Sequence, residues 1–190
     1  MENIKVLEQL YRYIAHGYSL FPVHSVKDSK CTCANKDCKS IGKHSKTYNG
    51  LMNATNNIKT IKEMSNLWID SNIGIATGRV SGIVVLDVDP RDDGDELLRV
   101  LTAQYQDLPR TVTALSGGGG LHYYFKYPES GIMSRNAFRS GLDFKSDDDW
   151  IIAPQSIHKS GQTYKWQEGF SPSDIPLALL PEWLHNLITS

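Results

Sequence analysis

The sequence lacks a long hydrophobic run. No apolar segment approaches the roughly 18 residues that would span a bilayer, and the amino terminus, Met1-Glu2-Asn3-Ile4-Lys5, has no hydrophobic stretch of the signal-peptide type. These absences exclude a membrane-spanning helix. They predict an intracellular protein, located in the cytoplasm, with no membrane partner.

Excess charge of either sign is missing as well. The 190 residues contain 20 Lys and Arg and 21 Asp and Glu, so the formal net charge is −1. Without a strong overall potential, any binding of nucleic acid must be local. The charges are unevenly spread, since 27–46 contains six lysines and two acidic residues, whereas 87–96 contains six acidic residues and one arginine. Such charged runs usually form solvated faces, and their position in the fold decides whether they take part in a binding site.

Internal repeats and low-complexity segments are also absent. Apolar residues make up 40% of the chain, and its 15 Gly and 8 Pro are ordinary for a globular protein. A chain of this length can bury a core without disulfides, either as one domain or as two small lobes around a shared core. We therefore expect residues 1–190 to form a single domain.

Hydrophobic periodicity predicts helices and strands in irregular order. Helices are expected over residues 2–17, 58–70, 93–106 and 177–187, and strands over 19–23, 72–77, 83–89, 111–115, 121–127, 142–145, 150–153 and 161–166. The run 83–86 is apolar throughout and suits a buried central strand. Because hairpins interrupt the alternation, the pattern favours an α+β fold over a doubly wound parallel sheet. Segment 27–48 has no periodicity and is expected to be a loop that something else must order.

All three cysteines lie within that loop. Cys31, Cys33 and Cys38 are followed by His44, which gives Cys-x-Cys, four residues, Cys, five residues and His. Three thiolates and one imidazole complete a tetrahedral shell for Zn²⁺, and free thiols are the alternative. A disulfide is disfavoured in an intracellular chain and would leave one thiol unpaired. We expect one structural Zn²⁺ that orders the loop and fixes its lysines as a basic projection.

Two carboxylates stand at the end of the apolar strand 83–89. Asp87 and Asp89 are two residues apart, so on a strand both project to the same face. A turn-forming pair before Pro90 is one interpretation, and a site for a hard divalent cation is the other. Asp143, in the middle of a short predicted strand, supplies a third carboxylate. Three such groups can hold two Mg²⁺ or Mn²⁺ ions for phosphoryl transfer.

A run of four glycines precedes a histidine in the hairpin between strands 111–115 and 121–127. In Ser116-Gly117-Gly118-Gly119-Gly120-Leu121-His122, backbone N–H groups can approach an anion without interference from Cβ atoms. A lone histidine on a strand is usually structural, but beside glycines and carboxylates His122 becomes a candidate for a phosphate contact. Neither a Walker-type nor a Rossmann glycine motif is present, which disfavours the usual ATPases and dehydrogenases.

The order of these motifs resembles a known family. The strand ending in Asp87-Val88-Asp89, then Ser116-Gly-x-x-Gly-x-His122, then Leu142-Asp143, is similar to the three motifs of the archaeo-eukaryotic primase superfamily. The sequence more specifically resembles one branch, the prim-pol domain of bifunctional DNA primase/polymerases from plasmids and phages. Further segments similar to that branch are Tyr18-Ser19-Leu20-Phe21-Pro22-Val23, the Cys-x-Cys…Cys…Gly42-Lys43-His44 segment, Ile73-Gly74-Ile75-Ala76-Thr77-Gly78, Ala153-Pro154-Gln155-Ser156-x-His158, Gly161-x-x-Tyr164-x-Trp166 and Leu180-Pro181-Glu182-Trp183-Leu184.

The resemblance implies a fold and a reaction. The fold would be a catalytic core, residues 72–166, with an RNA-recognition-like sheet packed on an amino-terminal α/β lobe that carries the zinc-binding loop, residues 27–48. The reaction would be template-directed attack of a nucleotide 3′-hydroxyl on the α-phosphate of an NTP or dNTP, on single-stranded DNA. Relatives often carry a helicase, so a replicative helicase or helicase domain is an expected partner.

The resemblance also assigns roles to individual residues. Asp87, Asp89 and Asp143 would hold two catalytic Mg²⁺ or Mn²⁺ ions, and His122 would act beside them. The nucleotide's phosphates would be bound by Ser116, Gly117, Gly120 and His122, with further triphosphate or template contacts expected from Arg135, Arg139, Lys145, Ser156, His158 and Lys159.

Two other functions remain as hypotheses. The first is a non-catalytic, zinc-containing nucleic-acid-binding module of a replication protein, in which the carboxylates are structural. The second is a replication-initiator nuclease with a tyrosine nucleophile, for which Tyr123 and Tyr124 are the available tyrosines. Such a nuclease needs a His-hydrophobe-His metal pair, and His122 has no such partner in the sequence, which disfavours it.

Overall fold

The computed structural model describes residues 2–190, with side chains from Val6 onward. Met1 lies outside the described residues, and so does the side chain of Ile4. The predicted first helix would place Ile4 on its apolar stripe. The helices are α1 (Glu2–Ala15), α2 (Ile58–Glu63), α3 (Ser65–Trp68), α4 (Gly94–Gln104) and α5 (Glu182–Thr189), with 3-10 turns η1 (Gly50–Asn53) and η2 (Pro90–Asp92). The strands are β1 (Leu20–His24), β2 (Val26–Lys27), β3 (Lys30–Cys31), β4 (Ser71–Ala76), β5 (Ile83–Val88), β6 (Thr113–Leu115), β7 (Leu121–Lys126), β8 (Arg135–Arg139), β9 (Leu142–Lys145), β10 (Trp150–Ile152), β11 (Lys165–Trp166) and β12 (Ala178–Leu179).

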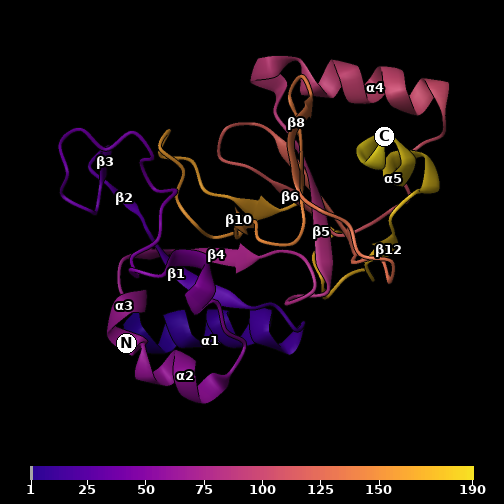
Figure 1. Ribbon diagram of the computed structural model, residues 1–190. Coiled ribbons are helices and arrows are strands. Elements are labelled where there is room, and N and C mark those ends of the chain that lie inside the picture. Colours follow the sequence, from indigo (N-terminus) through magenta and orange to yellow (C-terminus); the bar gives the residue numbers. More distant parts are fainter. Residues whose placement is uncertain (1) are drawn as a thin grey trace.

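The strands form two main sheets and a small ribbon (Figure 1). The large sheet has the order β11-β6-β7-β5-β9-β8, with β12 added parallel to the end of β7. Its central strand, β5, pairs antiparallel with β7 on one side and with β9 on the other. The small sheet has the order β1-β4-β10, and β2 and β3 form the ribbon. This is the mixed α/β architecture that the sequence predicts.

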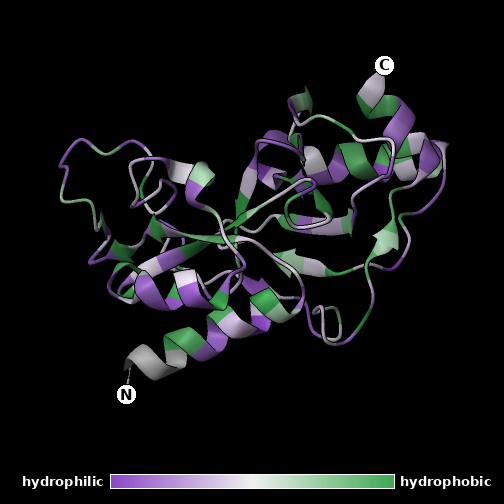
Figure 2. Cartoon of the chain, turned by 60° about the horizontal axis from the view of Figure 1, so that its bottom comes forward, coloured by the Kyte–Doolittle hydropathy of each residue, from purple (hydrophilic) through white to green (hydrophobic). Residues whose placement is uncertain are grey.

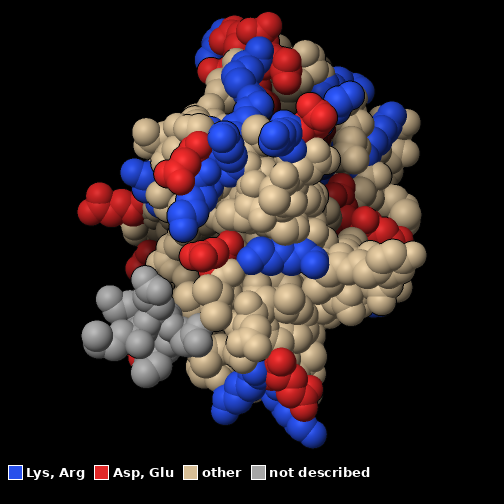
Figure 3. Space-filling model, turned by 90° about the vertical axis from the view of Figure 1, so that its left-hand side faces the viewer, with Lys and Arg blue, Asp and Glu red and all other residues tan. Residues whose placement is uncertain are grey.

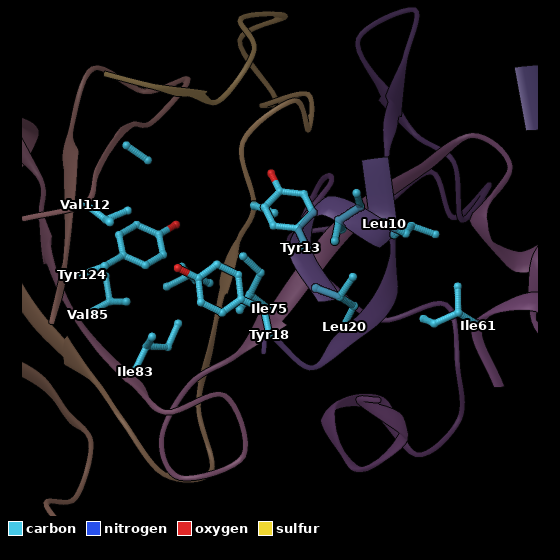
Figure 4. Close-up of a cluster of buried hydrophobic side chains, with 14 of the residues drawn as sticks. Leu10, Tyr13, Tyr18, Leu20, Ile61, Ile75, Ile83, Val85, Val112 and Tyr124 are labelled. Carbon is cyan, nitrogen blue, oxygen red and sulfur yellow. The ribbon is translucent and has the colours of Figure 1, made fainter. Parts of the chain in front are cut away.

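The large sheet is buried on both faces, which explains why β5 is apolar along its length. Val84, Leu86 and Val88 belong to a cluster shared with α4 and α5. Ile83 and Val85 point to the other face and join a cluster with α1 and the small sheet. Figure 4 shows this second cluster, in which residues of α1, β1 and β4 meet those of β5 and β7. One shared core therefore joins the large sheet to α1 and the small sheet.

Helix α1 covers the small sheet through one apolar stripe. Leu10 and Tyr13 are buried, whereas Glu8 and Arg12 are exposed, and Figure 2 shows the corresponding alternation of hydrophobic and hydrophilic bands along the helix. The Tyr13 hydroxyl donates a hydrogen bond of 2.8 Å to the carbonyl of Pro154, which satisfies its only polar group inside the core. Among the described residues, no helix is long and apolar enough to cross a membrane.

Two of the predicted helices are wrong in part. The helix expected over 58–70 is broken at Met64 into α2 and α3, since Met64 caps both with non-helical angles. The helix expected over 177–187 begins only at Glu182. Residues Ala178–Leu179 instead pair with β7, and Pro181 stands at the N-cap of α5, where its missing N–H costs nothing.

The sequence also missed three strands. Strand β8 has mostly exposed residues and no apolar alternation, because it lies at the edge of the large sheet. Strands β2 and β3 lie inside the segment expected to be a loop. The strand expected over 161–166 is confined to Lys165–Trp166.

Candidate active site and metal centre

The four predicted zinc ligands lie together. Candidate ligand atoms of Cys31, Cys33, Cys38 and His44 all lie within 4.8 Å of one another. His44 Nε2 is 3.3 Å from Cys31 Sγ and 3.5 Å from Cys38 Sγ. Three sulfurs and one imidazole nitrogen that converge in this way are the donor set of a structural zinc site. The residues present therefore fit one Zn²⁺.

A tight hairpin brings the first two ligands into place. Asp28 and Ser29, between β2 and β3, have φ values of 50° and 60°, which is the left-handed pair required by a two-residue type I′ turn. The turn reverses the chain so that Cys31 lies beside Val26 at the base of the ribbon. Cys31 is buried there. Burial alone would raise the pKa of its thiol, but hydrogen bonds from the Gly42 and Cys33 backbone lower that pKa to about 6 and favour the metal-binding thiolate.

We expect Cys33→Ser to release the metal and loosen the segment 27–48, because three remaining donors hold zinc much more weakly than four. Protein purified without added zinc should contain about one equivalent of zinc per chain, and the variant should contain far less. Asp37→Asn is the matched control, since Asp37 is exposed in the same loop and is not among the four ligands. Retention of full zinc by Cys33→Ser, or absence of zinc from the wild type, contradicts this ligand set.

A second group of functional side chains forms a row across the large sheet. In strand register, Asp87 of β5 lies opposite His122 of β7 on one side and opposite Asp143 of β9 on the other. Directly paired residues point to the same face of a sheet, so the three side chains stand side by side. His122 Nε2 is 3.4 Å from Asp87 Oδ1. The row lies on the face that also carries Val85, where the shared core ends.

A cavity of about 360 Å³ opens over this row. Asp87, His122 and Asp143 form its floor, and β10 of the small sheet contributes one wall. Its remaining lining comes from Ser40, Lys43, Lys145, Asp149, Trp150, Ile151, Ile152 and Tyr164. Larger hollows exist among the described residues, but the cavity above the row combines carboxylates, cations and a buried histidine, and such convergent polar groups are typical of ligand sites.

Asp143 is held in place from two directions. The backbone N–H of Ala137 donates a 2.5 Å hydrogen bond to Asp143 Oδ1, and Lys145 Nζ lies 3.2 Å from Asp143 Oδ2. Ala137 has a φ of 47°, at an irregularity in the β8–β9 pairing, and this bulge turns its N–H toward the carboxylate. Lys145 also lies 3.5 Å from Asp149 Oδ2. It therefore balances two carboxylates of the cavity.

His122 is the most buried member of the row, with 4% of its surface exposed. Desolvation lowers the pKa of its imidazole, and the nearby Asp87 opposes this shift. Nε2 faces Asp87, and Nδ1 has no hydrogen-bond partner among the described residues. A buried polar atom without a partner is unusual in a folded protein. Nδ1 is also shielded from solvent, so a ligand in the cavity can reach His122 at this nitrogen only if the side chain turns.

Asp89 departs from the strand geometry that the sequence predicts. Strand β5 ends at Val88, and Asp89 becomes the N-cap of η2 by accepting a 3.0 Å hydrogen bond from the Arg91 N–H. Its carboxylate also pairs with the Arg91 guanidinium through both oxygens, which holds the pKa of Asp89 below its usual value. Asp89 is not part of the lining of the cavity over the row. To act as a metal ligand, the Asp89 carboxylate would have to release the Arg91 guanidinium and bind the metal ion instead.

The glycine turn packs between the end of β5 and the segment around His158. A Cβ on Gly120 would lie 2.4 Å from the Val88 carbonyl, and one on Gly117 would lie 2.3 Å from His158 Cβ. Both positions therefore require glycine. Ser116 Oγ accepts hydrogen bonds of 3.3 and 2.9 Å from the N–H groups of Gly118 and Gly120. In the structure, the Ser116 side chain therefore stabilises the glycine turn through hydrogen bonds to its backbone.

Other predicted nucleotide contacts lie elsewhere. Arg135 Nη1 donates to the Ile188 carbonyl and Arg139 Nη1 to that of Phe138, and neither residue lines the cavity. Ser156 is buried, and its hydroxyl accepts from the Ile73 N–H. His158 is buried beneath the glycine turn and hydrogen-bonds Ser160, while Lys159 is exposed.

Several cavity residues were not predicted as site residues, among them Lys43, Asp149 and Tyr164. The sequence placed Lys43 in the lysine-rich loop and in a segment of the family resemblance, and Tyr164 in another such segment. Tyr164 is buried between His122 and His158, with ring centroids 6.0 and 5.8 Å away, and burial raises the pKa of its hydroxyl. The position of Lys43 between Gly42 and the predicted metal ligand His44 is a local sequence signal that could have suggested it as a site residue.

The fold and the site together define a class of protein. A carboxylate–histidine row on an antiparallel sheet, under a cavity rimmed by lysines and next to a Cys₃His loop, has the donor groups that divalent cations and phosphates take as partners. The family model for the bifunctional DNA primase/polymerase N-terminal domain matches residues 10–183. The chain belongs to this family. A search of curated proteins gives no match.

Family membership gives the function in outline. It implies a DNA primase/polymerase of the nucleotidyltransferase type, with DNA and nucleotides as substrates and a divalent metal requirement. The expected resemblance is thereby confirmed at the level of the family.

Proposed function

We propose that this chain catalyses template-directed nucleotidyl transfer from an NTP or dNTP on single-stranded DNA, by a two-metal mechanism, in replication of the plasmid or phage type. The observation that carries the proposal is the row formed by His122, Asp87 and Asp143 beneath one cavity. Oxygen donors from two neighbouring strands suit a hard divalent cation. The antiparallel order β6-β7-β5-β9 with α4 between β5 and β6 supports an RNA-recognition-like catalytic core.

Each residue of the site has a separate task in the proposed reaction. Asp87 and Asp143 would hold the cations, and Asp89 would join them after releasing Arg91. When bound, two divalent ions supply charge stabilisation for the attacking and leaving oxygens. Lys145 limits the repulsion between Asp143 and Asp149 before substrate arrives. His122, which lines the cavity beside Asp87, would contact the nucleotide's phosphates.

Template-directed synthesis on single-stranded DNA tests this function directly. Reactions with and without a supplied primer, each with Mg²⁺ or Mn²⁺ and with NTPs or dNTPs, should give product that depends on the metal and on the template. Product formed without a supplied primer would show that the protein starts primers de novo as well as extending them. Binding of single-stranded DNA with no incorporation under any of these conditions would replace the proposal by the non-catalytic zinc module.

We expect His122→Ala to weaken nucleotide binding about ten- to hundredfold, because it removes a charge-assisted hydrogen bond to a phosphate, worth roughly 1.5 to 3 kcal/mol. Titration of a labelled nucleotide in the absence of template isolates this contact. Some incorporation should survive at high nucleotide concentration, since the carboxylates remain. His16→Ala, which removes an exposed histidine at the end of α1, is the control. Equal nucleotide affinities for wild type and His122→Ala would contradict the phosphate contact, and His122 would then be a structural residue of the strand beside the site.

A further inference from the structure

Lys43 connects the zinc-binding loop to the catalytic cavity. It stands directly between Gly42 and the metal ligand His44, yet it lines the same cavity as Asp87, His122 and Asp143. Lys43 is solvent-exposed at the rim. Lys43 therefore borders the space above the carboxylate row, while the next residue along the chain is a predicted zinc ligand.

The backbone on the amino-terminal side of Lys43 is clamped by a buried asparagine. Asn72 of β4 is only 1% exposed, and its Nδ2 donates hydrogen bonds of 3.0 Å to the Gly42 carbonyl and 2.8 Å to the Ile157 carbonyl. Its Oδ1 accepts from Ser25 Oγ and from the Ile157 N–H. All four hydrogen-bonding positions of this amide are used. Gly42 has a φ of 71°, and a Cβ there would lie 2.7 Å from Val26.

The backbone on the carboxyl side of Lys43 is held by the small sheet. The His44 carbonyl accepts a 2.8 Å hydrogen bond from the His24 N–H, and the Lys46 N–H donates one of 2.9 Å to the Pro22 carbonyl. Residue Ser45 bridges to Val23 of β1. Lys46 Nζ is itself occupied by the carbonyls of Ile69 and Asp70. Lys43 thus projects from a short stretch that is fixed at both ends.

The charges around Lys43 suit a polyphosphate that brings its own cations. Asp87, Asp89, Arg91 and Lys159 are the charged groups that act on Lys43, two of each sign. His158, under the glycine turn, is also within range of Lys43 and Lys159. Since the acidic members are the proposed metal ligands, Lys43 and Lys159 remain for the phosphate oxygens farthest from the metals, and Arg91 would join them once Asp89 releases it. Figure 3 views the side on which β2 and β3 lie, where Lys and Arg side chains are interleaved with Asp and Glu.

We propose that Lys43 binds the β- and γ-phosphates of the incoming nucleotide and that the metal centre acts on catalysis by holding Lys43 over the cavity. This inference rests on the proposed function, because it assumes a nucleoside triphosphate above Asp87 and Asp143. It gives the zinc-binding loop a role in substrate affinity beyond local order. The other loop lysines, exemplified by the exposed Lys36, do not line the cavity.

Binding titrations without template test the contact independently of turnover. With a fluorescently labelled dATP in the presence of Mg²⁺, Lys43→Ala should bind about ten- to hundredfold more weakly than wild type. The corresponding labelled dAMP should bind wild type and Lys43→Ala equally, because it lacks the β- and γ-phosphates. Lys43→Arg should recover part of the triphosphate affinity. Lys36→Ala removes the same charge from the same loop and should bind like wild type.

The link to the metal centre requires a double-mutant cycle. Cys33→Ser should weaken dATP binding in the same direction as Lys43→Ala, and the combined variant should bind no more weakly than the worse of the two. Such non-additivity is expected when both changes remove one interaction. Circular dichroism and thermal unfolding of Cys33→Ser establish that the rest of the domain is folded. Full additivity would overturn the positioning role of the metal centre.

The possible outcomes separate this inference from the proposed function. If wild type binds dATP and incorporates nucleotides but Lys43→Ala binds dATP equally well, the inference about Lys43 is wrong and the proposed function stands. Equal losses of dATP and dAMP affinity in Lys43→Ala would also contradict a β,γ-phosphate contact. If wild type binds neither nucleotide and incorporates none, the proposed function itself fails.

Discussion

Asp87→Asn is expected to abolish nucleotide incorporation while leaving the domain folded. Asp87 is the middle member of the row, opposite both His122 and Asp143, so its loss removes a proposed metal ligand from the centre of the site. Replacing a charged oxygen by an amide costs several kcal/mol of charge stabilisation, which corresponds to at least about a hundredfold in rate. Primer extension at saturating Mg²⁺ or Mn²⁺ measures this loss, and circular dichroism monitors the fold.

Two further variants make this prediction specific. Asp143→Asn should lose extension in the same way, because its carboxylate lies across the strand pair from Asp87. Asp148→Asn is the matched control, since Asp148 is an exposed carboxylate of the nearby acidic turn and asparagine tolerates its φ of 58°. Near-wild-type extension by both Asp87→Asn and Asp143→Asn would remove the carboxylates from the mechanism.

Asn72→Ala is expected to give a large loss of stability. The substitution leaves the buried partners of a fully satisfied amide without hydrogen bonds, and each unsatisfied group costs about 1 to 3 kcal/mol. Because Ile157 and Gly42 can recover some hydrogen bonds from water, we expect a net loss of about 2 to 4 kcal/mol. For a domain of this size, that loss lowers the melting temperature by roughly 5 to 15 °C.

Thermal and urea unfolding of the zinc-loaded protein measure this effect. Asn56→Ala provides the control, because Asn56 is an exposed asparagine in the loop before α2 and its loss should change stability by no more than about 0.5 kcal/mol. A change in Asn72→Ala no larger than in Asn56→Ala would show that the clamp contributes nothing. Retention of zinc by Asn72→Ala would show that the clamp and the metal centre are separate supports of the loop.

The parts of the fold that the sequence predicted correctly are those with a strong local pattern. The run 83–86 identified the buried central strand, and the apolar stripe of 2–17 identified α1. The helix expected over 177–187 is wrong because the tertiary pairing of Ala178–Leu179 with β7 overrides the apparent helical periodicity. Strand β8 was missed because an edge strand needs no apolar alternation, and its stability comes from pairing with β9.

The candidate site was predictable where strand register alone determines it. Spacing and motif order placed Asp87, His122 and Asp143 in one hypothesis, and the strand pairing brings these three side chains together. Asp89 illustrates the limit, since the same spacing argument assumed that the strand continued past Val88. The position of Lys43 was not accessible to spacing arguments, because it depends on hydrogen bonds from Asn72 that cross 30 positions of sequence.

The free energy of local unfolding differs between the two sides of the candidate site. It is high for β5, which carries Asp87, and lower for the stretch that carries Lys43. Strand β5 has a partner on each side and a hydrophobic cluster on each face, so its amide protons can exchange with solvent only when the whole domain unfolds. The stretch that carries Lys43 is held by a few backbone hydrogen bonds, one asparagine and the metal centre. Its opening is a smaller fluctuation that leaves the sheet intact. We therefore expect the amide protons of this stretch to exchange with solvent at a lower free-energy cost than those of β5, which ties the rim of the cavity to the metal centre and its floor to the stability of the whole domain.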